Sequence, residues 1–111
     1  MKRGEIFLVS DPAGDSKRQR AFVVVSHQGL IDSRYSTVVC APVYTNGEGL
    51  GTRVSIGLDH GLKHESWIHC DSLASIPKSQ LTYYVGSLSA TKMKSLNNAL
   101  AVALDLPIEV Q

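Results

Sequence analysis

The stretch Phe22-Val-Val-Val-Ser26 decides the fold class, together with a second stretch of the same kind, Thr37-Val-Val-Cys-Ala-Pro-Val43. Both are short, apolar and rich in β-branched residues, which is typical of buried β-strands. Four further stretches have strand character and are separated by turn residues: Glu5–Val9, Thr52–Ile56, Ser66–Cys70 and Tyr83–Leu88. We therefore expect about six short strands at a spacing of roughly ten residues.

The last quarter of the chain has helical periodicity instead. Apolar residues recur at helical spacing from Met93 to Leu104, Ser89 can cap the first turn, and Pro107 cannot continue the helix. Many short strands followed by one helix predict a mainly β (α+β) fold, a small β-barrel with a packed C-terminal helix.

Length and composition limit the possible classes of protein. The chain has 111 residues, so we expect residues 1–111 to form a single domain. Hydrophobic residues make up 43%, which excludes a disordered tail. A formal net charge of +1 excludes a protein that coats a long polyanion, as histones do. Any contact with nucleic acid must therefore be local.

Neither export nor a membrane anchor is indicated. No apolar run approaches the ~20 residues that span a bilayer, and the N-terminal apolar stretch is broken by Asp11 and Pro12 before it reaches signal-peptide length. The two cysteines, Cys40 and Cys70, lack the spacing of a disulfide framework or a zinc site. We therefore expect a cytoplasmic protein.

The strand that precedes Asp71 carries the most informative polar residues. Side chains alternate across a strand, so Ile68 and Cys70 are expected in the core, while Trp67, His69 and Asp71 share the accessible face. A histidine near a carboxylate suits general acid–base chemistry, and a tryptophan can stack on a nucleobase. The alternative is an ordinary polar strand face on which Trp67 covers the helix or a partner.

Two other groups of residues are candidates for a functional site. Lys17, Arg18 and Arg20 form a basic cluster at the entry to the FVVVS strand, and an arginine there could stabilise charge at phosphorus. Tyr44, Thr45 and Asn46 offer two hydroxyls and an amide at the end of the TVVCAPV strand, beside a glycine-rich loop, residues 46–51, and such loops often cover a site. Alternatively, the cluster is a solvated loop and the two hydroxyl residues only terminate a strand.

Several common sites are not indicated by the sequence. His27, His60 and His64 share no metal-ligand spacing, and we expect them in solvated loops. The glycine-rich loop is not followed by GK[ST], and no serine lies in a G-x-S-x-G context. Neither a metal site nor a bound cofactor is therefore expected.

The order of these segments resembles the MazF/PemK family of toxins from type II toxin-antitoxin modules. The matching stretches cover essentially the whole chain: KRGEIFLVSDPAG (2–14), RAFVVVS (20–26), TVVCAPV (37–43), GTRVSIGLDHGLKHESWIHCDSLASIPKSQL (51–81), VGSLS (85–89) and ALAVALDL (99–106). The resemblance implies a small SH3-like β-barrel that forms a homodimer. It also implies metal-independent cleavage of single-stranded RNA, held in check by a cognate antitoxin.

The resemblance also assigns roles to residues. The key arginine of the family falls on Arg20, and the acidic general base of the PemK-like branch falls on Asp71. The family hydroxyl falls on Tyr44, with Thr45 one position further. His69 stands where that branch has an arginine, and an imidazole can donate a proton at neutral pH.

Two positions of the family pattern are lost. The Gln-x-Arg-Thr segment after the strand reads Ser72-Leu-Ala-Ser75, and the His-Glu pair of the first loop reads Asp15-Ser16. We therefore expect a different target sequence, and these losses leave open a barrel that only binds RNA or its antitoxin. Another alternative is a toxin of the same fold that binds a protein, as gyrase-inhibiting relatives do.

The predicted mechanism follows from these assignments. Asp71 takes the proton of the ribose 2′-OH, and His69 protonates the departing 5′-oxygen. Arg20 stabilises the charge on the phosphate, and the hydroxyl of either Thr45 or Tyr44 donates a hydrogen bond to the same group. Substrate-binding roles are expected for five further residues: Lys17, Arg18, Tyr44, Trp67 and Ser72.

Overall fold

The computed structural model describes residues 1–10, 19–47 and 50–107. Within these residues the chain forms seven strands: β1 (Glu5–Ser10), β2 (Gln19–Val24), β3 (Thr37–Tyr44), β4 (Arg53–Ile56), β5 (Ser66–His69), β6 (Ala74–Pro77) and β7 (Tyr83–Ser87). The helices are α1 (Gln28–Ile31) and α2 (Ala90–Ala103), and two 3₁₀ turns are η1 (Leu58–His60) and η2 (Lys78–Gln80). None of the described helices is long and apolar enough to span a membrane.

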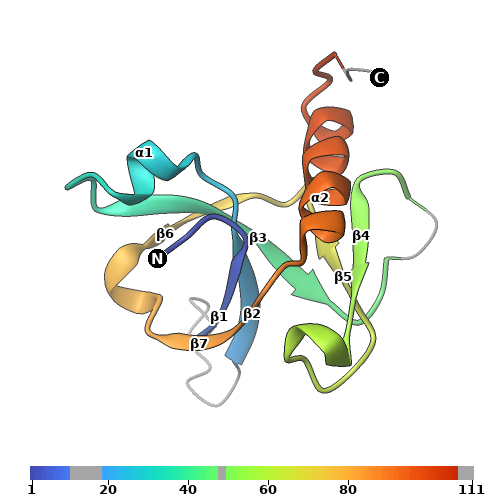
Figure 1. The fold of residues 1–111 in the computed structure, drawn as a ribbon, viewed down its shortest axis with the longest axis horizontal. Coiled ribbons are helices and arrows are strands. Elements are labelled where there is room, and N and C mark those ends of the chain that lie inside the picture. Colours follow the sequence, from blue (N-terminus) through green and yellow to red (C-terminus); the bar gives the residue numbers. More distant parts are fainter. Residues whose placement is uncertain (11–18, 48–49, 108–111) are drawn as a thin grey trace.

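The strands form one antiparallel sheet that curls into a half-barrel (Figure 1). Its order is β4-β5-β3-β2-β1-β7, and β6 pairs with β3 beside this path. The first half of β3 pairs with β6, whereas its last two residues, Val43 and Tyr44, pair with β5. Because one strand serves two neighbours along the same edge, the sheet bends at β3 and brings the ends of β3 and β5 together.

The apolar run in β2 is buried on both faces of the sheet. Val23 and Val24 are each 0% exposed, and they belong to two different clusters of buried side chains. One cluster lies under α2 and includes Ile6, Ile68 and Leu96, each 0% exposed. The other lies on the opposite face and is covered by α1. A continuous run of β-branched residues is therefore required here instead of an alternating one.

The C-terminal helix begins and ends close to where its sequence indicates. The Ser89 hydroxyl caps α2 by accepting a hydrogen bond from the Lys92 N–H at 3.2 Å. The helix lies beside β4 (Figure 1), and the Lys92 ammonium donates to the Ser55 hydroxyl at 3.1 Å. The mainly β fold with one long C-terminal helix is thus confirmed.

Three details differ from the sequence-based expectation. Strand β6 is an additional strand, and β2 begins at Gln19, so Arg20 lies within the strand and not before it. His60 is not in a solvated loop: it is 5% exposed, and its Nδ1 lies 2.9 Å from the carboxylate of Asp59. The short η1 turn that packs against β7 explains this burial.

Candidate functional site

The antiparallel register brings polar residues from three strands to one end of the sheet. Tyr44, the last residue of β3, lies opposite Trp67 of β5, and Arg53, the first residue of β4, lies opposite His69. Cross-strand partners have neighbouring side chains on the same face of a sheet. Arg53 therefore reaches His69 although the two are 16 residues apart in the sequence.

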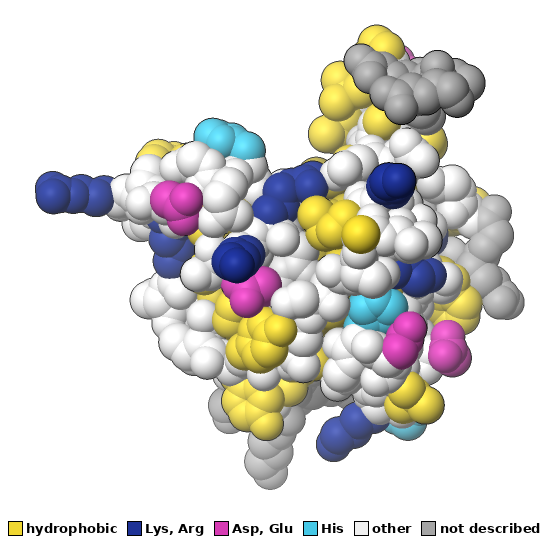
Figure 2. All heavy atoms as spheres, viewed as in Figure 1, with side chains coloured by type: hydrophobic (Ala, Val, Ile, Leu, Met, Phe, Trp, Pro, Cys, Tyr) yellow, Lys and Arg dark blue, Asp and Glu magenta, His cyan; other side chains and the backbone are white. Residues whose placement is uncertain are grey.

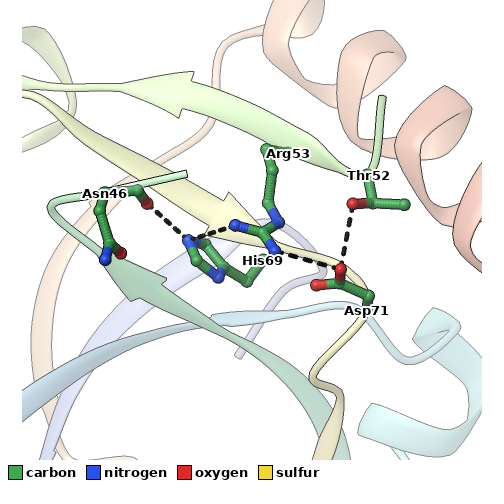
Figure 3. Close-up of polar contacts among 5 residues, drawn as sticks. All are labelled: Asn46, Thr52, Arg53, His69 and Asp71. Carbon is green, nitrogen blue, oxygen red and sulfur yellow. Dashed lines mark hydrogen bonds and ion pairs between the residues drawn. The ribbon is translucent and has the colours of Figure 1, made fainter. Parts of the chain in front are cut away.

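Hydrogen bonds and close contacts join four residues that we call the Arg53 cluster: Thr52, Arg53, His69 and Asp71 (Figure 3). The Arg53 Nη2 donates to Asp71 Oδ2 at 3.2 Å, and its Nη1 lies 3.3 Å from His69 Nε2. The Thr52 hydroxyl donates to the same Oδ2 at 3.2 Å. One guanidinium thus joins the imidazole to the carboxylate.

His69 is buried, which corrects the expectation that it lies on an accessible face. It is 7% exposed, and its Nε2 lies 2.7 Å from the carbonyl oxygen of Asn46 (Figure 3). Gly47 follows with a φ of +125°, and a Cβ there would lie 2.6 Å from both His69 Nε2 and Arg53 Nη1. The backbone of the glycine-rich loop covers the imidazole at this point, and only glycine fits so close an approach.

The charge of Arg53 acts on the carboxylate of Asp71. Partial desolvation by itself would raise the pKa of Asp71, but the hydrogen bond and positive charge of Arg53 outweigh it, and the pKa lies below its ordinary value. The Asp71 side chain is 39% exposed, against 16% for Arg53. Asp71 is therefore an anion at neutral pH that solvent can reach.

Arg20 is joined to the Arg53 cluster by Tyr44. The Arg20 guanidinium lies 4.1 Å from the centre of the Tyr44 ring, and its Nη1 donates to the Val43 carbonyl at 3.1 Å. The same ring lies 4.5 Å from that of His69, at an angle of 59°. One continuous array consequently runs through Arg20, Tyr44, His69, Arg53 and Asp71.

A groove of about 760 Å³ lies beside this array. Arg20, Tyr44, Thr45 and Asn46 form part of its wall. The remaining wall comes from β1, β2, β7 and the segment after η1, and contains Lys63, His64, Tyr83 and Tyr84. Since Tyr44 and Asn46 also contact His69, they connect the groove to the Arg53 cluster.

The other candidate residues have different surroundings. Thr45 is exposed in the groove, and Trp67 is half-buried on β5 between its cross-strand partners Tyr44 and Ser55. Ser72 is exposed, and its N–H donates to the His69 carbonyl at 3.3 Å. Lys17 and Arg18 lie outside the described residues.

The cysteine next to the candidate site, Cys70, is buried in the core. Cys70 is 1% exposed and points into the core with Ile68, as the strand alternation predicts. Burial, with a smaller contribution from the charge of Asp71, raises the pKa of Cys70 to about 11, so its thiol is uncharged at neutral pH. Across residues 1–10, 19–47 and 50–107, no three His, Cys, Asp or Glu side chains are placed to hold a metal ion.

Sequence reasoning missed Arg53 and the backbone of Asn46 and Gly47. Arg53 stands at the start of a strand-like stretch, but only the pairing register shows that it lies opposite His69. The glycine-rich loop was the one available signal for the cover over the imidazole, and it does not show which side chain is covered.

The curled antiparallel half-barrel sheet and the C-terminal helix packed against it define a small, mainly β protein, with a polar array at the ends of β3, β4 and β5. The family model described as "PemK-like, MazF-like toxin of type II toxin-antitoxin system" matches residues 2–104. The chain belongs to this family.

Individual relatives agree with this assignment. The chain is 30% identical over 84 residues to a protein of Mycobacterium tuberculosis named endoribonuclease MazF3, covering 76% of this chain and 82% of that one. The structure of the M. tuberculosis toxin MazF-mt6 has 25% identity and a TM-score of 0.80, with coverage of 94% and 99%. A mycobacterial endoribonuclease in complex with its cognate antitoxin has the same fold, with 24% identity, a TM-score of 0.84 and coverage of 98% and 99%.

Proposed function

We propose that the protein is the toxin of a type II toxin-antitoxin system and an endoribonuclease that cleaves single-stranded RNA without a metal ion. The observation that carries this proposal is the array from Arg20 to Asp71: Arg20 and Tyr44 line the groove, and contacts through His69 and Arg53 connect them to the Asp71 carboxylate. The relative named endoribonuclease MazF3 supports the same activity.

The reaction is an internal transfer at phosphorus. Asp71 accepts the proton of the ribose 2′-OH, and the 2′-oxygen forms a bond to the adjacent phosphorus. The bond from phosphorus to the 5′-oxygen breaks, and His69 protonates that oxygen. The products are a 2′,3′-cyclic phosphate and a 5′-hydroxyl. No metal is required because the nucleophile belongs to the substrate.

Charge on the phosphate is stabilised at the groove. Arg20 neutralises the non-bridging oxygens, and the Thr45 hydroxyl donates to the same group, with Tyr44 holding Arg20 in place. Lys17 and Arg18 bind flanking phosphates, whereas Trp67 and Ser72 contact bases.

His69 has to be released before it can act through Nε2. A carbonyl oxygen accepts hydrogen bonds, so Nε2 carries a hydrogen that is directed at Asn46 in this structure. RNA bound in the groove contacts Asn46 directly, since Asn46 forms part of the wall. The form of His69 that can act as the acid is the imidazolium, with a hydrogen on each ring nitrogen. Substrate binding then moves this carbonyl away, frees the Nε2 proton for the leaving oxygen and leaves a neutral imidazole.

The partners follow from the family. A homodimer, an RNA substrate and a cognate antitoxin are proposed, with action in the cytoplasm. On the face seen in Figure 2, cationic side chains are scattered among acidic ones and do not form a continuous patch. This distribution fits an enzyme that binds a few phosphates and not one that coats a polyanion.

Incubating the protein with single-stranded RNA in EDTA tests the proposal. Wild type should cleave the RNA, and Arg20→Ala and Asp71→Ala should not cleave it while keeping the fold. Arg34→Ala is the matched control, because Arg34 is exposed and lies outside the site.

Other results would support the alternatives. An absence of cleavage by folded wild type, combined with growth arrest in cells, would indicate a toxin that binds a protein. RNA binding without either effect would indicate a barrel that has lost its activity. Cleavage only with added Mg²⁺ would contradict the mechanism.

A further inference from the structure

We infer that Arg53 is a positioning residue for RNA cleavage: it fixes one oxygen of Asp71, presents the other to the substrate, and holds His69 beside it. The inference rests on the proposed function. Arg53 does not need to touch RNA for this role, since it acts through the two residues that do.

The hydrogen bonds of Asp71 are one-sided. Arg53 Nη2 and the Thr52 hydroxyl both donate to Oδ2, each at 3.2 Å. No described side chain donates to Oδ1. The side-chain hydrogen bonds therefore all anchor Oδ2, and none of the described side chains prevents Oδ1 from accepting the proton of a ribose hydroxyl.

Arg53 contacts His69 through packing and not through a donated hydrogen bond. Nε2 of His69 carries a hydrogen toward the Asn46 carbonyl, so it cannot also accept one from Arg53 Nη1 at 3.3 Å. Arg53 thus lies against one edge of the imidazole, and the Tyr44 ring lies 4.5 Å away against it. The two side chains confine the ring between β4 and β3.

Arg53 makes this arrangement although its own hydrogen bonds are incomplete. Its Nε is buried and has no acceptor among the described residues. A buried donor without a partner destabilises the folded chain. An arginine whose only role was stability would be expected to have a hydrogen-bond acceptor for its Nε. The geometry therefore favours a role for Arg53 in the site.

Among the residues that the structure describes, few charged and titratable groups surround the pair, and the Cys70 thiol beside them lies on the core face of β5. Arg53 faces both Asp71 and His69 from β4, and Tyr44 faces His69 from β3, with Arg20 on the far side of the Tyr44 ring. Arg53 is therefore the cation whose removal most directly affects the ionisation of Asp71.

The test is the pH dependence of RNA cleavage by Arg53→Gln and Arg53→Lys, with Arg34→Gln as the control. Arg53→Gln should reduce kcat about 100-fold, the loss expected for a misplaced catalytic group. It should also move the acidic limb of the profile to higher pH, because Asp71 loses the cation that keeps it ionised. Arg53→Lys keeps the charge, so its acidic limb should stay close to that of wild type while kcat is reduced.

Three results would overturn the inference while wild type still cleaves RNA. The first is an Arg53→Gln variant with the wild-type profile. The second is an equal shift of the acidic limb in Arg53→Lys and Arg53→Gln. The third needs no variant: ¹³C NMR of folded wild type should show the Asp71 carboxyl titrating below its usual range, and titration within that range would contradict the role. Failure of wild type to cleave RNA would refute the proposed function instead.

Discussion

At the scale of residues, the candidate site is built around a carboxylate that is kept charged. Asp71 has lower pKa than an ordinary aspartate because Arg53 lies within hydrogen-bonding distance. The same residue is accessible to solvent, and its Oδ1 is left free by the described side chains. A carboxylate in this setting carries no proton at neutral pH, so it is free to accept one from a substrate hydroxyl.

Replacement of Asp71 by Asn should remove this base and keep its shape. We expect Asp71→Asn to cleave RNA about 10²–10⁴-fold more slowly than wild type, the usual contribution of a positioned base. The rate is measured with a short labelled RNA. Asp105→Asn is the control, since Asp105 is exposed beyond α2 and Asn tolerates its φ of 55°. Wild-type cleavage by folded Asp71→Asn would show that the base lies elsewhere.

The lowered pKa of Asp71 also predicts how stability depends on pH. Asp71 binds protons less readily in the folded chain than in the unfolded one, where the pKa is near 3.8. Its contribution to the free energy of unfolding is therefore present above about pH 4 and is lost as the pH falls through the lower, folded value. Urea unfolding across this range should show a weaker acid dependence for Asp71→Asn than for wild type. Identical dependences would contradict the ion pair with Arg53.

Gly47 is the residue whose backbone covers His69. Gly47→Ala should lower the free energy of unfolding by about 1–3 kcal/mol, because alanine is strained at a φ of +125° and its Cβ would meet His69 and Arg53. Urea unfolding measures this loss. Gly51→Ala is a control from the same loop, since among the described residues a Cβ there meets Val102 alone, at an ordinary contact distance of 3.7 Å. A loss no larger than that of the control would mean that the loop does not hold the imidazole tightly.

At the scale of elements, α2 stabilises the half-barrel that carries the site. Leu96 is 0% exposed and joins the cluster that includes residues of β1, β2, β3, β4 and β5. Leu96→Ala should therefore cost about 2–5 kcal/mol of unfolding free energy, measured by urea unfolding. Asn97→Ala, on the exposed side of the helix, should change it far less. Equal effects would show that α2 is not packed as described.

The elements that could be predicted from the sequence are those with a strong local pattern. The β-branched runs of β2 and β3 and the helical periodicity after Ser89 each indicate one structure, and both outcomes are confirmed. Strand β6 was missed because it has four residues, Ala74–Pro77, and lacks such a run. It exists because β3 offers it an edge, which is a property of the folded sheet.

In the site, too, local sequence patterns predict some features, whereas others depend on the folded sheet. Strand alternation places Trp67, His69 and Asp71 on one face and Cys70 in the core, and the burial of Cys70 confirms the latter. The burial of His69 could not be predicted, because it depends on the loop after β3. The position of Arg53 could not be predicted either, because it depends on the register of β4 against β5.

At the scale of the whole molecule, the even charge and the small size have a common explanation. The formal net charge is +1, and the groove is lined by a few cations and several tyrosines. Such a surface holds a short piece of RNA by local contacts. A chain of 12.0 kDa has little area for a complete binding cleft, so the proposed dimer would extend the groove across two copies.

The end of α2 exposes several apolar side chains on the surface of the molecule. Val102, Leu104 and Leu106 are 47%, 54% and 54% exposed, and hydrophobic side chains gather there in Figure 2. Apolar groups of this size at one end of a helix are typical of contact surfaces.

The central claim is that this chain cleaves RNA through the substrate's own 2′-oxygen. The most direct measurement is the incubation of two matched oligonucleotides in EDTA, an RNA that the protein cuts and the same strand with a 2′-deoxy sugar at the cleaved position. The RNA should give 2′,3′-cyclic phosphate and 5′-hydroxyl ends, and the deoxy strand should stay intact. Cleavage of the deoxy strand, or 5′-phosphate ends, would contradict the claim.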